Sequence, residues 1–497
     1  MKKSKSMRVR ERLDHPVVDG DGHWLESFPV LTDYVAEIGG PRLADEFRKG
    51  WLERHGRRWY QVDASERMRH RMNRVVWWGL PANAYDRATS MIPALLHERI
   101  QEAGIDFALM YPTNGRHSVS VRDDDLRRVY ARAINTMAAD LFKPYRDRLS
   151  PVAIVPINTP TEAIEELDYA VNTLGMKAMI TSGWVQRTLP ADADWQPDPA
   201  KRRVYVDSIA QDAAYDYDPF FAKCMDLKVA LTTHIGTMGW SDRTSPTSYV
   251  ANHLGHFAQA HHLLARGLVM GGVMHRFPKL KVGFLEGGAG WGANLFHDLI
   301  GHWKKRNRKA MEELLRPTNI DEADLKKLFQ KHATHPRFKG KIDEIVERNL
   351  MCVEPGMSSK ELVDRDAWED DFRASKIKGV ADIKRIFSEN FFFGCEADDP
   401  TAAWALDEKI NGVALRPLLG SDISHWDLPD LTSVLEEAHE LVDDGHLDAA
   451  QFRAFTFANV VALHGGMNPD FFKGTVVEKE AAQELARNKP ARMAKAS

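Results

Sequence analysis

The sequence has little of several features that would place it in a specialised class of protein. Its 497 residues include three cysteines, Cys224, Cys352 and Cys395, which lie far apart and form no CxxC pair. This pattern excludes a disulfide framework and fits a protein of the reducing cytoplasm. No run of about 18 consecutive apolar residues occurs, so we expect no membrane span.

An excess of charge of one sign is also missing. The chain has 71 acidic and 67 basic residues, a formal net charge of −4, so no global field favours nucleic acid. The basic N-terminus, MKKSKSMRVRER, has no apolar stretch behind it and indicates a solvated tail rather than a signal peptide. We therefore expect a cytoplasmic protein with a small-molecule substrate and neither nucleic acid nor membrane as partner.

Short apolar runs, separated by helical patterns, recur along the chain. Each run is rich in Val, Ile, Leu or Phe and is bounded by Gly, Pro, Asp or Thr, which is typical of parallel strands covered by helices. The predicted strands are 15–19, 105–111, 150–156, 176–180, 227–233, 280–286, 390–396 and 414–422, and the clearest predicted helices are 122–142, 160–174, 249–266 and 288–304.

The repeated strand-then-helix order with eight strands predicts an α/β fold, a closed (β/α)8 TIM barrel. A doubly wound open sheet is the alternative. The barrel is favoured because polar residues suited to chemistry follow strands at both ends and in the middle of the chain, and a barrel brings all those strand ends to one mouth.

Two segments extend the bare barrel. We expect residues 1–475 to form one domain, with a helical cap at about 40–100 and a helical insertion at about 303–385 between the sixth and seventh strands. Residues 476–497 are predicted to be a polar C-terminal tail. The cap segment contains several arginines, could form a subunit contact in a homodimer, and is rich in tryptophan, namely Trp51, Trp59, Trp77 and Trp78.

The first strand ends in an alternating series of polar residues, Asp19, Asp21 and His23, separated by glycines. Alternate residues of an extended strand point to the same face, so these three side chains can point the same way. The fifth strand ends in His234, the sixth in Glu286 and the eighth in Asp422. Imidazole nitrogen together with carboxylate oxygen is the ligand mixture of a catalytic divalent cation, so the set predicts a metal centre at the barrel mouth.

Six motifs give the chain a recognisable pattern. It resembles the amidohydrolase-2 branch of the amidohydrolase superfamily, metal-dependent hydrolases that include decarboxylases of the aminocarboxymuconate-semialdehyde and resorcylate type. The resemblance covers both ends of the barrel and leaves out the cap and the insertion. The motifs are VVDGDGH (17–23), THIG (233–236), GGVMHRFPKLKVGFLEGGAGW (271–291), GCEADDP (394–400), GSDISHWD (420–427) and FANVVALHG (457–465).

The resemblance implies roles for individual residues. Asp21 and His23 stand where the first strand of such enzymes gives two ligands, often His-x-His or Glu-x-His, so Asp21 is a departure. His234 matches the ligand after the fifth strand. Asp422 matches the aspartate that binds metal and handles a proton, and His425 matches a histidine near the mouth that we take as a second catalytic candidate.

Glu286 stands where many members have a histidine, so the centre is richer in oxygen than usual. Oxygen ligands favour iron or manganese, although zinc also accepts carboxylates, and Glu286 could bridge two ions. A carbamylated lysine bridge is not expected, because Lys177 lies inside or before its strand and should point away from the mouth. His253 and His256, three residues apart on one predicted helix, could supply an extra ligand or simply form a polar helix face.

Three readings of the function stay open. The leading one is a metal-dependent enzyme, with one or two ions of zinc, iron or manganese, that hydrolyses or non-oxidatively decarboxylates a small organic acid or amide. The second is a non-haem di-iron oxygenase or hydroxylase on the same barrel, favoured by the carboxylate-rich ligand set. The third is a barrel without catalytic activity that only binds a ligand.

Overall fold

The structure is a computed structural model that describes residues 3–54, 57–76, 78–190, 203–234, 242–316, 319–348 and 370–487. Several features named above lie outside these residues. They are Cys352, Trp77, residues 235–236 of the THIG motif, part of the predicted insertion and residues 488–497 of the predicted tail.

Eight parallel strands form one sheet in the order β1-β2-β3-β4-β7-β8-β9-β10. Every one of them overlaps a predicted apolar run. Their bounds are β1 Val18–Trp24, β2 Phe107–Pro112, β3 Leu149–Ile154, β4 Ala178–Thr181, β7 Leu231–Thr233, β8 Val282–Phe284, β9 Phe391–Cys395 and β10 Pro417–Leu419.

The first and last strands lie side by side and bring the sheet to a nearly closed barrel. The backbone NH of His23 donates to the carbonyl of Ile423 (3.1 Å), and the NH of Asp422 donates to the carbonyl of Asp21 (3.1 Å). An open doubly wound sheet would leave its two edge strands apart. The predicted (β/α)8 barrel is therefore confirmed.

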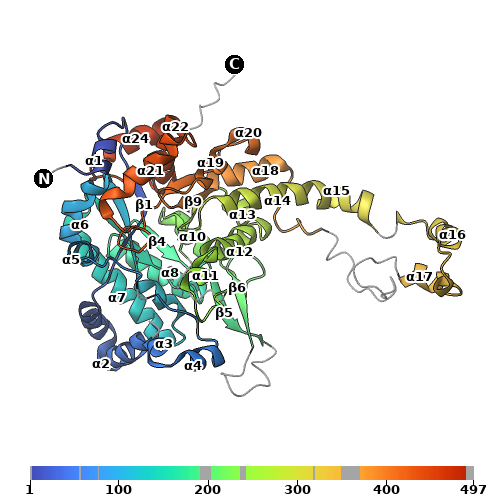
Figure 1. Cartoon of the computed structure of the whole chain (residues 1–497), viewed down its shortest axis with the longest axis horizontal. Helices are drawn as coiled ribbons and strands as arrows, with labels where there is room; N and C mark the ends of the chain where they lie inside the picture. Colours follow the sequence, from blue (N-terminus) through green and yellow to red (C-terminus); the bar gives the residue numbers. More distant parts are fainter. Residues whose placement is uncertain are drawn as a thin grey trace. The chain divides into compact units, whose positions relative to one another are not determined.

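Helices follow most strands of the barrel and cover its outer face (Figure 1). Strand residues are consequently buried on both faces, as the apolar runs predict; all of β4 and β9 is buried. Among the described residues, and counting both those that cover the barrel and those that do not, the helices are α1 Lys5–Arg10, α2 Phe28–Arg54, α3 Arg57–Gln61, α4 Ala64–Arg69, α5 Ala84–Met91, α6 Pro93–Arg99, α7 Asp124–Phe142, α8 Pro160–Asp168, α10 Asp218–Asp226, α11 Tyr249–His253, α12 His256–Met270, α13 Val273–Arg276, α14 Gly290–Arg306, α15 Arg308–Ala310, α16 Glu322–His332, α17 Ile342–Arg348, α18 Val380–Arg385, α19 Thr401–Leu406, α20 Glu408–Asn411, α21 Val434–Asp443, α22 Ala449–Arg453, α23 Asn459–Met467 and α24 Glu478–Arg487.

The single helix predicted over 249–266 is wrong. Gly255 has φ 75°, in the left-handed region, so α11 ends at His253 and α12 begins at His256. Glycine adopts this conformation without the steric cost that a Cβ would add. The break means that the i, i+3 spacing of His253 and His256 does not place them on one helix face.

A two-stranded antiparallel hairpin was not predicted. It pairs β5 (Trp184–Thr188) with β6 (Val204–Ser208) and follows β4 on the chain. Each hairpin strand is only partly buried, so neither gives the continuous apolar run by which the barrel strands were recognised.

The segment predicted as a cap consists of helices between β1 and β2. Its first helix, α2, changes direction at Gly40 (φ 77°), directly before Pro41. Further along, the NH of Arg74 donates to the carbonyl of Ser245 (2.8 Å), which joins this segment to the loop after β7.

The chain divides into two compact units, one of residues 1–295 and 384–497 and the other of Phe296–Ile383, in the region of the predicted insertion. In the second unit Trp303 packs edge-on against Phe372, with ring centroids 5.2 Å apart. In the first unit the terminal helix α24 carries Glu484, whose Oε2 lies 2.5 Å from Nη2 of Arg453.

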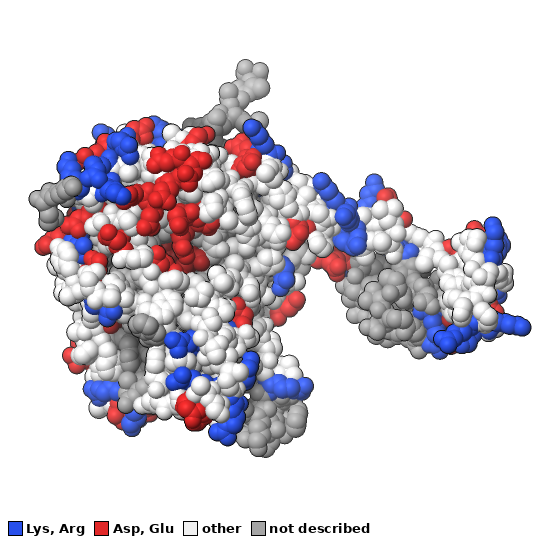
Figure 2. Space-filling view, viewed as in Figure 1, with Lys and Arg blue, Asp and Glu red and all other residues white. Residues whose placement is uncertain are grey.

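Acidic side chains gather on the face of the first unit that carries α21 (Figure 2). This helix has the sequence VLEEAHELVD, with Glu436, Glu437 and Glu440 among its acidic residues.

No helix among the described residues is both long enough and apolar enough to cross a membrane.

Candidate metal centre

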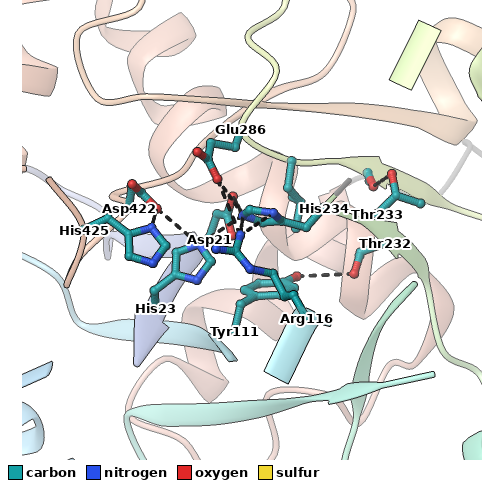
Figure 3. A network of polar contacts seen from close by, with 12 residues as sticks. Asp21, His23, Tyr111, Arg116, Thr232, Thr233, His234, Glu286, Asp422 and His425 are labelled. Carbon is teal, nitrogen blue, oxygen red and sulfur yellow. Dashed lines mark hydrogen bonds and ion pairs between the residues drawn. The ribbon is translucent and has the colours of Figure 1, made fainter. Parts of the chain in front are cut away.

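Polar side chains from four strand ends converge at the mouth of the barrel (Figure 3). Asp21 and His23 lie in β1, while His234 and Glu286 follow β7 and β8. Each offers a ligand atom, and these four atoms lie within 4.8 Å of one another. Asp422, after β10, belongs to two further groups of converging donor atoms. One of them shares His23 with the first group, and the other shares Glu286 with it.

The donor atoms are spaced as ligands of one ion would be. Nε2 of His23 is 3.1 Å from Nε2 of His234 and 3.2 Å from Oδ1 of Asp422. Nε2 of His234 is 2.7 Å from Oε2 of Glu286 and 3.8 Å from Oδ2 of Asp21. Two ligands at about 2.1 Å from one ion are at most about 4.2 Å apart, so the residues present fit a divalent cation.

Burial sets the protonation of these groups in the absence of a cation. It lowers the pKa of His23 and His234 well below the usual value, which leaves both imidazoles neutral, the form that binds metal. Burial and then the Glu286 carboxylate raise the pKa of Asp21 and of Asp422 well above the usual range.

Three carboxylate oxygens of this cluster are orphaned. Among the described residues, Oδ1 of Asp21, Oδ2 of Asp422 and Oε2 of Glu286 are buried and have no hydrogen-bond partner. A buried polar group that is left without a partner costs about 1–3 kcal/mol, and a charged one costs more. A bound cation would satisfy Oδ1 of Asp21 and Oε2 of Glu286, so this observation also fits a metal centre.

The backbone is in an unfavourable conformation at the two acidic residues that follow β8 and β10. Glu286 has φ 58° and Asp422 has φ 47°, in the left-handed region that side-chain-bearing residues rarely adopt. Such conformations cost on the order of 1–3 kcal/mol each and cluster at functional sites. At Asp422 the hydrogen bond from its NH to the carbonyl of Asp21 holds the conformation in place.

The expectation that Asp19 points the same way as Asp21 and His23 is wrong. The pairing of β1 with β2 shifts register between Asp19 and Gly22, which breaks the simple alternation. The Asp19 carboxylate accepts hydrogen bonds from the NH of Asp21 (3.0 Å) and from the NH (3.0 Å) and hydroxyl of Ser421. Burial raises its pKa to about 6, and it joins β1 to the loop that carries Asp422.

His425 lies beside the centre with both ring nitrogens engaged. Its Nδ1 is 2.6 Å from Oδ1 of Asp422, and its Nε2 is 3.0 Å from the hydroxyl of Thr113. The ring stacks on that of His23, with centroids 4.1 Å apart. This geometry suits a residue that orients the Asp422 carboxylate.

His253 and His256 are not in any of the groups of converging donor atoms. Nδ1 of His256 forms a hydrogen bond with the Asp242 carboxylate. The ring of His253 instead packs against Trp426, with ring centroids 5.2 Å apart. Trp78, from the predicted cap, packs edge-on against the same Trp426 at 4.9 Å. Aromatic side chains therefore extend from the predicted cap to the loop after β10.

Lys177 lies just before β4 and away from the centre. Its Nζ donates to the backbone carbonyls of Asp470 (3.1 Å) and Phe471 (2.6 Å). Lys177 is therefore directed to the segment around residue 470, as its predicted orientation away from the mouth requires.

Arg116 was missed by the analysis of the sequence. It lies in the turn after β2, and its Nη1 is 2.6 Å from Nδ1 and 2.8 Å from Nε2 of His234 and 3.9 Å from Oε2 of Glu286. The polar run TNGRH after the second apolar run is the signal that could have identified it, by the same strand-end argument that was applied to the other strands.

Asp427 was also missed, although it ends the GSDISHWD motif. Its carboxylate forms a group with Glu286 and Asp422 whose ligand atoms lie within 4.8 Å of one another. Asp427 is two residues after His425, so a spacing argument that extended past the histidine would have included it.

A cavity of about 360 Å³ opens beside Glu286 and is lined on its other side by the acidic residues Glu396, Asp398 and Asp399. Partial burial and the carboxylates of Asp427 and Glu286 raise the pKa of Glu396 to about 8. Glu286 thus lies at a cavity rich in acidic side chains, which favours the approach of cations.

Comparison with known proteins agrees with this geometry. The amidohydrolase family model matches residues 18–320, more than half of the chain. No curated protein sequence matches the chain.

Solved structures resemble the chain at low sequence identity. An amidohydrolase from Mycobacterium avium subsp. paratuberculosis K-10 is 15% identical with a TM-score of 0.50, over 91% of this chain and 100% of that one. A 2,6-dihydroxybenzoate decarboxylase from Rhizobium is 15% identical with a TM-score of 0.44, over 90% and 98%. A dihydroxybenzoic acid decarboxylase from Polaromonas sp. JS666, with bound manganese and 2-nitroresorcinol, is 15% identical with a TM-score of 0.46, over 90% and 97%.

The family match covers β1, β7 and β8, and with them the four residues whose donor atoms converge, Asp21, His23, His234 and Glu286. The barrel and the arrangement of strand ends agree with that match. The chain belongs to the amidohydrolase family and is an enzyme of that family.

Proposed function

We propose that the protein is a metal-dependent enzyme that hydrolyses or non-oxidatively decarboxylates a small organic acid or amide. One observation carries the proposal: imidazole and carboxylate donors from separate strand ends approach one another within 4.8 Å at the barrel mouth. Structural ion pairs bring two groups together, whereas neutral imidazoles and orphaned carboxylates gathered at one point are typical of a cation site.

Asp21, His23, His234 and Glu286 would hold the cation, with Asp422 at its edge. This oxygen-rich set suits manganese, iron or zinc. When bound, such a cation supplies Lewis-acid polarisation of a substrate oxygen or of water. It would also compensate the buried carboxylates and return the pKa of Asp422 toward its ordinary range.

In the hydrolytic reaction Asp422 acts as the general base. Its Oδ1 is held by Nδ1 of His425, so its buried Oδ2 is the atom that remains to accept a proton. The proton is taken from the attacking water and is returned to the nitrogen or oxygen that leaves when the carbonyl bond breaks. Thr113 fixes the His425 ring from the other side, which keeps the Asp422 carboxylate in one orientation.

In the decarboxylation the same carboxylate works in the opposite direction. The bond between the substrate's carboxylate and the ring or chain carbon that carries it breaks, and CO2 leaves. Asp422 then delivers a proton to that ring or chain carbon. Arg116 places a guanidinium within 4 Å of Glu286 and beside His234. It would offset the charge that an acidic substrate brings into a centre already rich in carboxylates.

Turnover of a panel of small carboxylic acids and amides by chelated and manganese-restored protein tests the proposal. We expect activity only in the restored protein and its loss in Asp422→Asn, with the exposed Asp444→Asn as the matched control. Release of CO2 indicates decarboxylation, whereas release of amine or alcohol indicates hydrolysis. Full activity of the chelated protein, or unchanged activity in Asp422→Asn, would contradict the proposal.

Oxygen activation by two irons is the second candidate. It is favoured by the overlap of three ligand groups around Glu286 and Asp422, which offers more donors than one ion requires. Two irons per chain and turnover that stops under nitrogen would support it. Activity under nitrogen with manganese or zinc would exclude it.

A homodimer and a cytoplasmic location stay predictions. Light scattering of the purified chain would measure the first, and fractionation of cells that express it would measure the second.

A further inference from the structure

A fully buried histidine on α12, His261, contacts the ends of both β7 and β8. Its Nε2 is 2.6 Å from the carbonyl oxygen of Leu285, which directly precedes Glu286. Its Nδ1 is 3.1 Å from the hydroxyl of Thr233, which directly precedes His234 (Figure 3). One imidazole therefore joins the residues that come before two proposed ligands.

The two contacts define which ring nitrogen carries the proton. A carbonyl oxygen only accepts hydrogen bonds, so Nε2 of His261 donates to Leu285. Burial lowers the pKa of His261 to about 3, which keeps the imidazole neutral. Nδ1 therefore accepts from the Thr233 hydroxyl, and both ring nitrogens have a partner.

The contact with Leu285 falls beside an unfavourable point of the backbone. Glu286 has φ 58°, and the Leu285 carbonyl that His261 holds belongs to the peptide unit whose orientation this angle sets. On the other side of Glu286, the NH of Gly288 donates to the carbonyl of Gly394 (2.9 Å). A residue keeps such a conformation only where its surroundings over-determine it. The two hydrogen bonds restrain the chain on both sides of Glu286.

Packing fixes the ring of His261 in the place from which it reaches Leu285. The ring stacks on that of Trp291, with centroids 5.9 Å apart and an angle of 27° between the planes. A Cβ at Gly287 would lie 3.0 Å from Cδ2 of His261 and 3.0 Å from Nε1 of Trp291. A glycine after Glu286 thus leaves the room that the histidine ring occupies.

We propose that His261 is a positioning residue of the centre, which sets the separation of the His234 and Glu286 side chains through the residues that precede them. The inference rests on the cation site of the proposed function. Nε2 of His234 and Oε2 of Glu286 are 2.7 Å apart. Without the bond to the Leu285 carbonyl, Glu286 is free to relax to an ordinary φ, which moves its carboxylate away from His234.

Two conservative substitutions separate the two hydrogen bonds. The amide of His261→Gln reaches the place of Nε2 and can still donate to the Leu285 carbonyl, whereas the shorter amide of His261→Asn reaches only the place of Nδ1. His261→Phe keeps a ring against Trp291 and removes both bonds. The exposed His275→Asn, on α13, is the matched control.

The test uses the full chain, freed of metal by chelation and titrated with manganese in a calorimeter. We expect His261→Phe and His261→Asn to bind manganese about tenfold or more weakly, as for other partners that orient a ligand. His261→Gln and His275→Asn should bind it as the natural protein does. Cobalt in place of manganese adds a readout that a merely structural role would not move, because its visible absorption reports the arrangement of the ligands. This spectrum should change in His261→Phe and His261→Asn only.

The outcomes separate this inference from the proposed function. If His261→Phe keeps the manganese affinity and the cobalt spectrum of the natural protein, even with a lower Tm, the positioning role is overturned and the proposed function stands. An equal loss of affinity in His261→Gln and His261→Asn also overturns it, since the bond to Leu285 is the one that the role requires. A natural protein that binds neither metal overturns both proposals. The comparison of His261→Gln with His261→Asn decides the matter even where His261→Phe fails to fold.

Discussion

Replacing Asp422 by asparagine should stabilise the cation-free protein and remove most of its stabilisation by metal. The substitution keeps the size of the side chain and deletes one charge from a group of carboxylates that lie within 4.8 Å of one another. The new amide can donate a hydrogen bond to Asp427 or Glu286, so the change leaves no donor without an acceptor.

The magnitude follows from the separation. Two unit charges about 4.8 Å apart repel by about 3.5 kcal/mol at an effective dielectric constant of about 20. Burial and the neighbouring Glu286 raise the pKa of Asp422, so the cluster relieves part of this repulsion by taking up protons. The stabilisation of the cation-free variant is therefore expected to be positive and on the order of a few kcal/mol, smaller than the repulsion among fully ionised carboxylates.

The effect reverses when manganese is present. A ligand at about 100 times its Kd stabilises the folded state by about 2.7 kcal/mol, and a hundredfold loss of affinity reduces this to about 0.4 kcal/mol. Urea unfolding, followed by circular dichroism with chelator and with manganese, measures both effects. A cation-free variant that is less stable than the natural protein, or an equal gain in stability from manganese in both proteins, would contradict this prediction.

Three further predictions concern the surroundings of the centre. Arg116→Gln should lower kcat/KM for carboxylate substrates by about tenfold or more, as expected for loss of a charge-assisted contact. The same variant should bind manganese more tightly in calorimetry. The exposed control Arg122→Gln should change neither kcat/KM nor manganese affinity. In chelated protein, stability should fall as the pH rises from about 4.5 to about 8. Folding raises the pKa of the Glu396 carboxyl to about 8, so the unfolded chain releases that proton at a lower pH than the folded chain does. Glu396→Gln should therefore flatten this part of the profile of Tm against pH. Gly394→Ala places a Cβ 2.8 Å from the backbone that follows β8. It should therefore lower the free energy of unfolding by about 1–3 kcal/mol and weaken manganese binding. Gly301→Ala, whose Cβ would meet no atom within 4 Å, should do neither.

The barrel could be predicted because its strands are buried on both faces and therefore appear as continuous apolar runs. The convergence of His23, His234 and Glu286 could be predicted from the same runs, since parallel strands of a barrel end at one mouth. Neither inference needs contacts between side chains.

The features that were missed depend on local backbone geometry or on loops. The break at Gly255 depends on a single left-handed φ, and the orientation of Asp19 depends on a register shift within β1. Apolar periodicity encodes neither. Arg116 and Asp427 lie beyond strand ends, where the direction of a side chain is set by the turn that carries it.

Side chains distant in the sequence are proposed to bind one cation at the barrel mouth. Crystals of the full chain grown with manganese would test it most directly, through an anomalous difference map measured near the manganese absorption edge. We expect a peak about 2.0–2.3 Å from Nε2 of both His23 and His234. The absence of a peak at the barrel mouth, or a peak that contacts neither histidine, would contradict it.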